Sequence, residues 1–285
     1  MVIVAAAVAL TTALEAGSTG GSQLDPSLFA NGACKAFPPT AGERNRTVFL
    51  DAGHGGVDPG AVGSTQSGAA VYEADATLPV ELDAMALLRA AGFRVVVSRT
   101  TDSTVLRLRP GDEVDGSLTL LGAHDDVAAR DRCANLAGAS ALVGIYFDAN
   151  ASPQEAGSLT AYDAARPFAA ANLKLATLLQ RDTLAVMNGH GWQIPDDGVV
   201  SDTGLGSSVG DPATGGLAAQ AAAYGHLLLL GPAMAGYFST PSQMPGAVIE
   251  PLYITDPFEG SLAASPAGQR AIAAGIAMAV EQFLG

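Results

Sequence analysis

Four side chains in separate parts of this 285-residue chain could do chemistry. His54 stands in the run Ala-Gly-His-Gly-Gly, directly after a short apolar stretch. Glycines on both sides let the backbone approach a ligand closely and leave the imidazole uncrowded. A single histidine at the end of a strand is nevertheless more often structural than a ligand, so a structural role stays open for this residue.

Glu250 gives the strongest physical indication of a site. It lies inside the apolar run Ala-Val-Ile-Glu-Pro-Leu-Tyr-Ile. Burying a carboxylate there is costly unless the group is paired, faces a metal or has a function. The alternative is a glutamate on an edge strand that faces water.

Glu73 and Asp148 are the other two candidates. Glu73 opens an expected helix after a Gly- and Ser-rich loop, where a carboxylate also compensates the helix dipole. Asp148 follows the strand-like run GIYF and, taken alone, is an ordinary loop acid.

Strand-like and helix-like runs alternate along the chain. This alternation predicts a single α/β domain with a mixed, largely parallel sheet flanked by helices. Strands are expected over 47–51, 93–98, 141–147, 227–230 and 248–254, helices over 74–91, 126–138, 169–187 and 266–284, and a long loop over 189–216. Sites in such sheets form outside the carboxyl ends of the strands, where the candidate side chains fall.

The N-terminus has the pattern of an export signal. Residues 2–14 carry no charge; the run is shorter than the ~20 residues of a membrane-spanning helix and fits the ~7–15 residues of a signal h-region. A positive n-region is missing, so a disordered or buried segment is the alternative. We expect a signal peptide over 1–16, an arm or linker over 17–46 and one domain over 47–285, in a secreted, periplasmic or cell-wall protein without a stable membrane span.

Charge and cysteine content narrow the possibilities further. The formal net charge of −14 disfavours nucleic acid as a partner, because phosphate backbones would repel the chain. The two cysteines, Cys34 and Cys133, favour a disulfide if the protein is exported. Two buried free thiols are the alternative, and neither cysteine has a neighbour at the spacing of a metal site.

Four blocks resemble the zinc-dependent N-acetylmuramoyl-L-alanine amidase family (amidase type 3), in the same order along nearly the whole domain. The blocks are FLDAGHGGVDPGAVG, YEADATLPVELDAMALLRAAGFRVVVSRTTD, ARDRCANLAGASALVGIYFDANAS and PGAVIEPLYITDPFEG. The resemblance implies that His54 and Glu73 are zinc ligands and that Glu250 activates the attacking water.

Asp148 departs from the family pattern, which has a histidine at this position. The third zinc ligand would therefore be a carboxylate, which zinc accepts. Two ionised carboxylates would make the site neutral, so weaker activation of water or a different metal preference is expected. The remaining histidines, His124, His190 and His226, are alternative sources of a ligand.

The resemblance implies hydrolysis of the amide bond between N-acetylmuramic acid and the L-alanine of the stem peptide. Peptidoglycan or muropeptides would be the partners, and we expect a monomer. Two alternatives stay open: a non-catalytic or regulatory pseudo-amidase that binds cell wall, and a related zinc exopeptidase that acts on free peptides.

Overall fold

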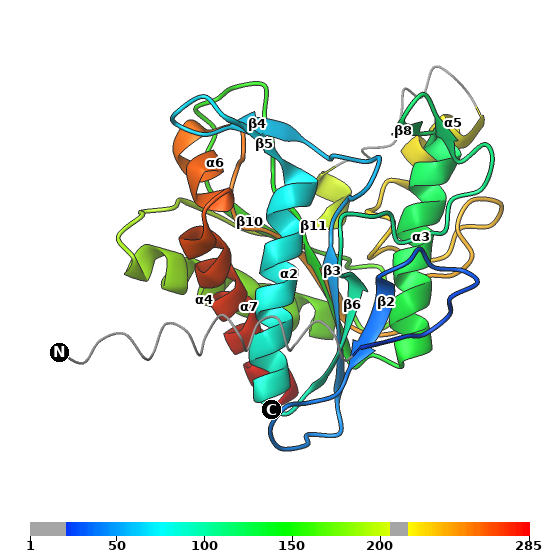
Figure 1. Cartoon of the computed structure of the whole chain (residues 1–285), viewed down its shortest axis with the longest axis horizontal. Helices are drawn as coiled ribbons and strands as arrows, with labels where there is room; N and C mark the ends of the chain where they lie inside the picture. Colours follow the sequence, from blue (N-terminus) through cyan, green and yellow to red (C-terminus); the bar gives the residue numbers. More distant parts are fainter. Residues whose placement is uncertain (1–20, 206–215) are drawn as a thin grey trace.

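The computed structural model describes residues 21–205 and 216–285 (Figure 1). The expected signal peptide over 1–16 lies outside the described residues. No helix in these two ranges is both long and apolar enough to cross a membrane.

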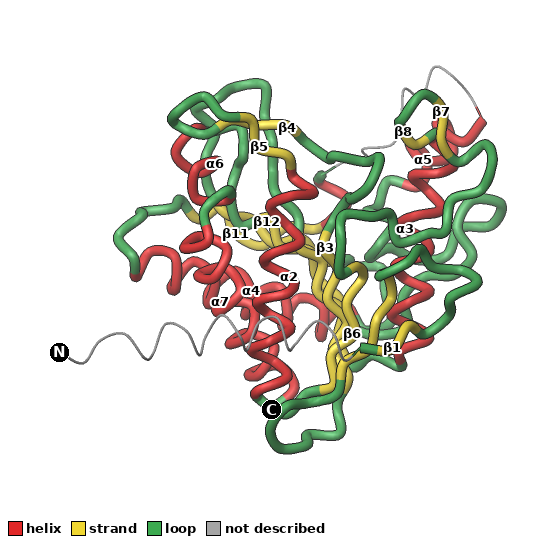
Figure 2. The backbone as a smooth tube through the Cα atoms, viewed as in Figure 1, coloured by secondary structure: helices red, strands yellow, loops and turns green. Residues whose placement is uncertain are grey.

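An eight-stranded sheet crosses the centre of the molecule (Figure 2). Its strands are β1 (Ser22–Gln23), β2 (Ala33–Phe37), β3 (Thr47–Ala52), β6 (Arg94–Arg99), β9 (Ala141–Ile145), β10 (Ser158–Tyr162), β11 (Asp196–Ser201) and β12 (Gly246–Glu250). Their order is β1-β2-β6-β3-β9-β12-β10-β11. The central strands β6, β3, β9 and β12 run parallel, whereas β2 and β10 are antiparallel to their inner neighbours. The predicted mixed, largely parallel sheet is confirmed.

Helices cover both faces of the sheet (Figure 1). One face carries α2 (Glu73–Ala90), α4 (Ala169–Gly189) and α7 (Pro266–Leu284), while α3 (Leu120–Ala137) and α5 (Gly216–Tyr224) lie on the other side. The short helix α6 (Pro257–Ala263) and the ribbons β4 (Val62–Ser64) with β5 (Ala70–Tyr72) and β7 (Glu113–Val114) with β8 (Ser117–Leu118) complete the fold.

Alternation along the strands divides the core into two layers. Val48 and Leu50 of β3 pack with α2, α4 and α7, whereas Phe49 between them packs with α3. Successive side chains of a strand point to opposite faces, so a continuous apolar run is the pattern of a strand covered on both sides.

Part of the expected arm or linker over 17–46 belongs to the sheet. β2 pairs with β6, and β1 pairs with β2. The predicted disulfide is confirmed: Cys34 of β2 and Cys133 of α3 are bonded, with their Cα atoms 5.7 Å apart.

Two expectations for the second half of the chain are wrong. Residues 227–230 form a turn, although Leu229 and Leu230 are buried against the core on the α3 side. The expected loop over 189–216 contains β11 and the 3-10 helix η1 (Asp202–Gly204), because polar residues there pair with β10. An apolar run indicates burial, and strand pairing depends on a partner that a local pattern does not show.

Candidate active site

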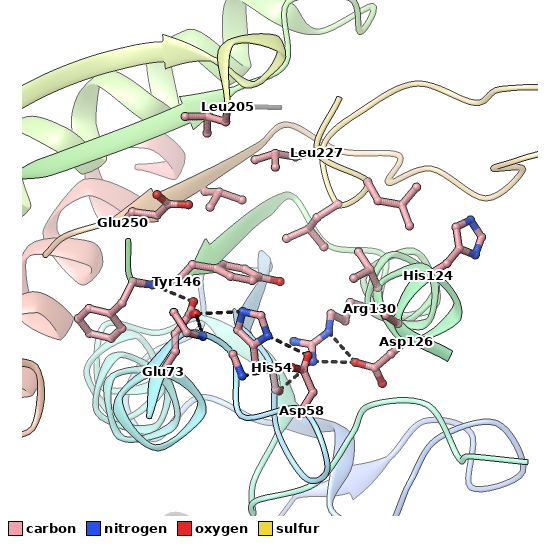
Figure 3. A pocket seen from close by; sticks show the side chains of 18 of the residues that line it. His54, Asp58, Glu73, His124, Asp126, Arg130, Tyr146, Leu205, Leu227 and Glu250 are labelled. Carbon is pink, nitrogen blue, oxygen red and sulfur yellow. Dashed lines mark hydrogen bonds and ion pairs between the residues drawn. The ribbon is translucent and has the colours of Figure 1, made fainter. Parts of the chain in front are cut away.

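Three parallel strands deliver three of the predicted residues to one edge of the sheet. β3, β9 and β12 are direct neighbours, and His54, Asp148 and Glu250 lie at or just beyond their carboxyl ends. Glu73, the first residue of α2, lies at the same edge (Figure 3).

His54 is held between two carboxylates. Its Nδ1 atom lies 2.8 Å from Oδ2 of Asp58, and its Nε2 atom lies 3.1 Å from Oε2 of Glu73. Burial opposes a charged imidazole, but the hydrogen bonds and charges of the two carboxylates outweigh it and raise the pKa of His54 to about 10. The residue has a φ of 59°, in the left-handed region that few side chains adopt.

Glu73 joins two loops beneath the site. Its Oε1 atom accepts a hydrogen bond of 3.0 Å from the backbone N–H of Phe147, after β9, and Oε2 accepts one of 2.9 Å from Ala61. The side chain is buried. These contacts fix the carboxylate so that Oε2 faces His54.

Asp148 lies on the opposite side, close to Glu250. The segment around Asp148 pairs with the segment after β12 through a bridge to Tyr253. Burial, together with the carboxylates of Asp148 and Glu73, raises the pKa of Glu250 to about 8. Glu250 therefore retains its proton near neutral pH when no cation is nearby.

Of the three predicted metal ligands, two are in contact and the third, Asp148, lies apart from them. Among the described residues, Asp163, Asp202 and His226 have ligand atoms that all lie within 4.8 Å of one another, whereas His54, Glu73 and Asp148 do not form such a group. His54 and Glu73 meet directly. Asp148 has a short side chain, and its Oδ1 atom accepts a hydrogen bond of 2.6 Å from the N–H of Ala149.

A cavity of about 570 Å³ opens over the site. All four predicted residues line it. Leucines of the segment 227–229 form an apolar wall, of which Figure 3 labels Leu227. Of the other three histidines, His124 and His226 line this cavity, and His190 stacks on Trp192 at 4.7 Å between ring centroids. His226 contacts Asp163 and Asp202.

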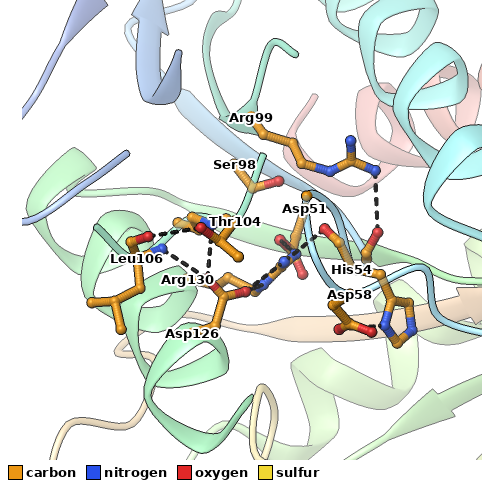
Figure 4. A network of polar contacts seen from close by, with 12 residues as sticks. Asp51, His54, Asp58, Ser98, Arg99, Thr104, Leu106, Asp126 and Arg130 are labelled. Carbon is orange, nitrogen blue, oxygen red and sulfur yellow. Dashed lines mark hydrogen bonds and ion pairs between the residues drawn. The ribbon is translucent and has the colours of Figure 1, made fainter. Parts of the chain in front are cut away.

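A buried charge network supports the loop that carries His54 (Figure 4). Arg130 pairs with Asp51 and Asp126 at 2.8 Å each, and it donates to the backbone carbonyl of His54. Asp126 also accepts hydrogen bonds of 2.7 Å from the N–H groups of Val105 and Leu106. This network was not predicted from the sequence, although the i, i+4 spacing of Asp126 and Arg130 indicates one of its pairs.

An imidazole and several carboxylates gathered at the ends of central strands are an arrangement that metal-dependent hydrolases use. Residues 48–282 match the family model for N-acetylmuramoyl-L-alanine amidase, so the chain belongs to that family. No curated protein matches the chain.

Solved structures agree with this fold. The chain is similar to the amidase AmiC2 of Nostoc punctiforme, with 21% identity, a TM-score of 0.56 and coverage of 85% of this chain and 99% of that one. It is also similar to an N-acetylmuramoyl-L-alanine amidase from Clostridium difficile 630, with 24% identity, a TM-score of 0.56 and coverage of 84% and 96%. The CwlD amidase from Clostridioides difficile, solved with the GerS lipoprotein, has 20% identity, a TM-score of 0.60 and coverage of 84% and 98%.

Proposed function

We propose that this protein cleaves the amide bond between N-acetylmuramic acid and L-alanine in peptidoglycan or muropeptides. The observation that carries the proposal is the contact of His54 with Glu73, facing a cavity that Glu250 also lines, in a chain of this family. A candidate metal-binding pair and a candidate base that line one cavity support the proposal.

The geometry of this pair fits zinc. Two ligands at ~2.05 Å on a tetrahedral zinc ion lie about 3.3 Å apart, and Nε2 of His54 lies 3.1 Å from Oε2 of Glu73. The contact of Nδ1 with Asp58 is the outer contact that a ligating histidine commonly makes, and it leaves Nε2 for the metal. Asp148 is the proposed third ligand. Zinc, when bound, supplies the Lewis acidity that polarises the scissile carbonyl.

Glu250 is the proposed general base and acid. Its carboxylate takes a proton from the attacking water and passes that proton to the departing amine of L-alanine. A pKa raised by burial suits both steps, since the carboxyl group can hold and release a proton near neutral pH. Glu73 and Asp58 keep the imidazole of His54 in place throughout.

Asp148 also supports a second candidate, a cell-wall-binding pseudo-amidase. Its carboxylate accepts a hydrogen bond from the N–H of Ala149 and raises the pKa of Glu250. It does not form a compact group with His54 and Glu73. A third ligand in this position binds a metal less tightly than a histidine directed at the same point. In this alternative the cavity would hold a muropeptide without cleaving it.

The disulfide supports a site of action outside the cytoplasm. A bond between Cys34 and Cys133 is stable in oxidising compartments, which supports export to the periplasm, cell wall or medium. We also propose that residues 1–16 are a signal peptide and that the protein is a monomer.

Mass spectrometry of muropeptides incubated with the protein and zinc tests the activity. Release of intact stem peptides from N-acetylmuramic acid is expected, and Glu250→Gln should keep the metal content but lose the hydrolysis. Binding of muropeptides without cleavage by the metal-loaded wild type would identify the pseudo-amidase. Cleavage of peptides that lack sugar, with muropeptides left intact, would identify an exopeptidase.

A further inference from the structure

Two neighbouring strands end in aspartates at matching positions, away from the candidate active site. β10 and β11 run parallel with Tyr162 opposite Ser201, so the next residues, Asp163 and Asp202, lie side by side. Both aspartates are fully buried. His226 reaches them from the segment after α5, with Nδ1 2.8 Å from Oδ2 of Asp163 and 3.4 Å from Oδ2 of Asp202.

Each carboxylate accepts a backbone hydrogen bond with one oxygen, and its other oxygen makes no hydrogen bond within the described residues. Oδ1 of Asp163 accepts a hydrogen bond of 2.6 Å from Ala165, and Oδ2 of Asp202 accepts one of 3.1 Å from Leu227. Oδ2 of Asp163, Oδ1 of Asp202 and Nδ1 of His226 are buried and make no hydrogen bond within the described residues.

The contact between His226 and Asp163 has the distance of a hydrogen bond but lacks its geometry. Nδ1 of His226 and Oδ2 of Asp163 are 2.8 Å apart, yet neither atom makes a hydrogen bond. The ligand atoms of the three residues lie within 4.8 Å of one another, close enough to share one ion. Buried polar atoms of native proteins are nearly all satisfied, so three unpaired atoms at one place indicate a missing partner.

The charges identify that partner as a cation. Asp163 and Asp202 are two fully buried acids with one imidazole beside them. The nearby guanidinium of Arg166 donates instead to the carbonyls of Leu230 and Gly231. A divalent ion would neutralise the two carboxylates and use all three unpaired atoms.

We propose that Asp163, Asp202 and His226 form a second metal site, for a divalent transition ion of the zinc class. One imidazole with two carboxylates is a ligand set for zinc, whereas calcium and magnesium take oxygen ligands. Nδ1 of His226 lies 2.8 Å from Oδ2 of Asp163, and the ligand atoms of the three residues lie within 4.8 Å of one another; two ligands on a tetrahedral ion are ~3.3 Å apart.

This site is separate from the candidate active site. Glu250 pairs with Leu159, and Asp163 lies four residues further along the same strand direction. At ~3.3 Å per residue, the two sites are roughly 13 Å apart along the sheet. The proposal therefore does not depend on the proposed amidase activity.

The ion would link the segment 226–229, which forms one wall of the cavity, to the ends of β10 and β11. His226 and the leucines that follow it line the cavity, and Asp163 and Asp202 are fixed at the ends of β10 and β11. A metal bridge between them would hold the wall in a region where the structure has a turn and no strand pairing.

Zinc content of the full chain tests the proposal. We would strip the protein with a chelator, add zinc, remove the excess by dialysis and measure bound zinc in His54→Ala and in His54→Ala/His226→Ala. His54→Ala removes the ligand of the other site, so this comparison reports on the second site alone. We expect one zinc ion in the single variant and none in the double variant, with His54→Ala/His190→Ala as the matched control that keeps one.

The outcomes separate this proposal from the proposed activity. If the wild type holds one ion that His226→Ala loses, the second site stands and the first does not bind zinc. If His54→Ala holds no zinc, or loses none on removal of His226, the cluster is a hydrogen-bonded triad and the metal proposal is overturned. Asp202→Asn in the His54→Ala background replaces the histidine variant if that variant does not fold, and the same loss is expected.

Discussion

The guanidinium of Arg130 donates a hydrogen bond of 2.9 Å to the backbone carbonyl of His54. This contact ties helix α3 to a residue whose φ of 59° lies in the left-handed region. Because Arg130 is also paired with Asp51 and Asp126, the loop conformation is coupled to a fully buried charge network.

We expect Arg130→Met to destabilise the protein by about 3–5 kcal/mol, because it leaves two buried carboxylates without their partner. Urea unfolding monitored by circular dichroism measures the change. Arg181→Met is the matched control, since Arg181 pairs with Asp182 but its own side chain is exposed, and it should change the free energy of unfolding little. Equal effects of the two variants would contradict the role of the network.

We expect Asp148→His to tighten zinc binding at the candidate active site by about tenfold or more, equivalent to ~1.4 kcal/mol. A neutral imidazole removes one negative charge and reaches further than the aspartate. Titration with a zinc indicator measures the affinity, and muropeptide release measures the turnover, which should rise with it. Unchanged affinity and turnover, together with an active Glu250→Gln, would refute the assigned site.

Glu81 should make stability depend on pH. It is fully buried, its Oε2 atom has no hydrogen-bond partner among the described residues, and burial raises its pKa from 4.5 to about 7. A raised pKa in the folded state means that the contribution is fully present below pH ~4.5 and is lost as the pH rises through ~7.

We therefore expect the wild type to lose on the order of 3 kcal/mol more stability over this range than Glu81→Gln. Urea unfolding at several pH values measures the difference. Glu43→Gln, at an exposed glutamate, is the control and should follow the wild type. Identical pH profiles for the wild type and Glu81→Gln would exclude this role.

Removing the disulfide as Cys34→Ser/Cys133→Ser should cost about 4–5 kcal/mol in the chain-entropy model, since the bond closes a loop of 99 residues. Unfolding with and without a reductant measures the same quantity in the wild type. The double variant should be insensitive to the reductant, and a reductant-insensitive wild type would contradict the bond.

Local patterns predicted the features that depend on local chemistry. The apolar strands β3, β6 and β9 and the helices α2, α4 and α7 were expected close to their observed bounds. The order of strands and helices also placed His54, Glu73 and Glu250 around one cavity.

Features that depend on long-range pairing were not predicted. β11 is polar and exposed in part, so only its register with β10 makes it a strand. The group of Asp163, Asp202 and His226 was missed for the same reason. Asp202 was placed inside an expected loop, and its approach to Asp163 follows from that register.

The antiparallel pairing of β10 with β12 bears on which sequence changes the fold can accept. β9 ends and β10 begins at the same edge of the sheet, so residues 146–157 connect them without crossing a face. Insertions or deletions within the exposed part of this connection would alter the rim of the cavity while every strand kept its register. New substrate preferences could thus arise by changes in loop length, independently of the stability of the core.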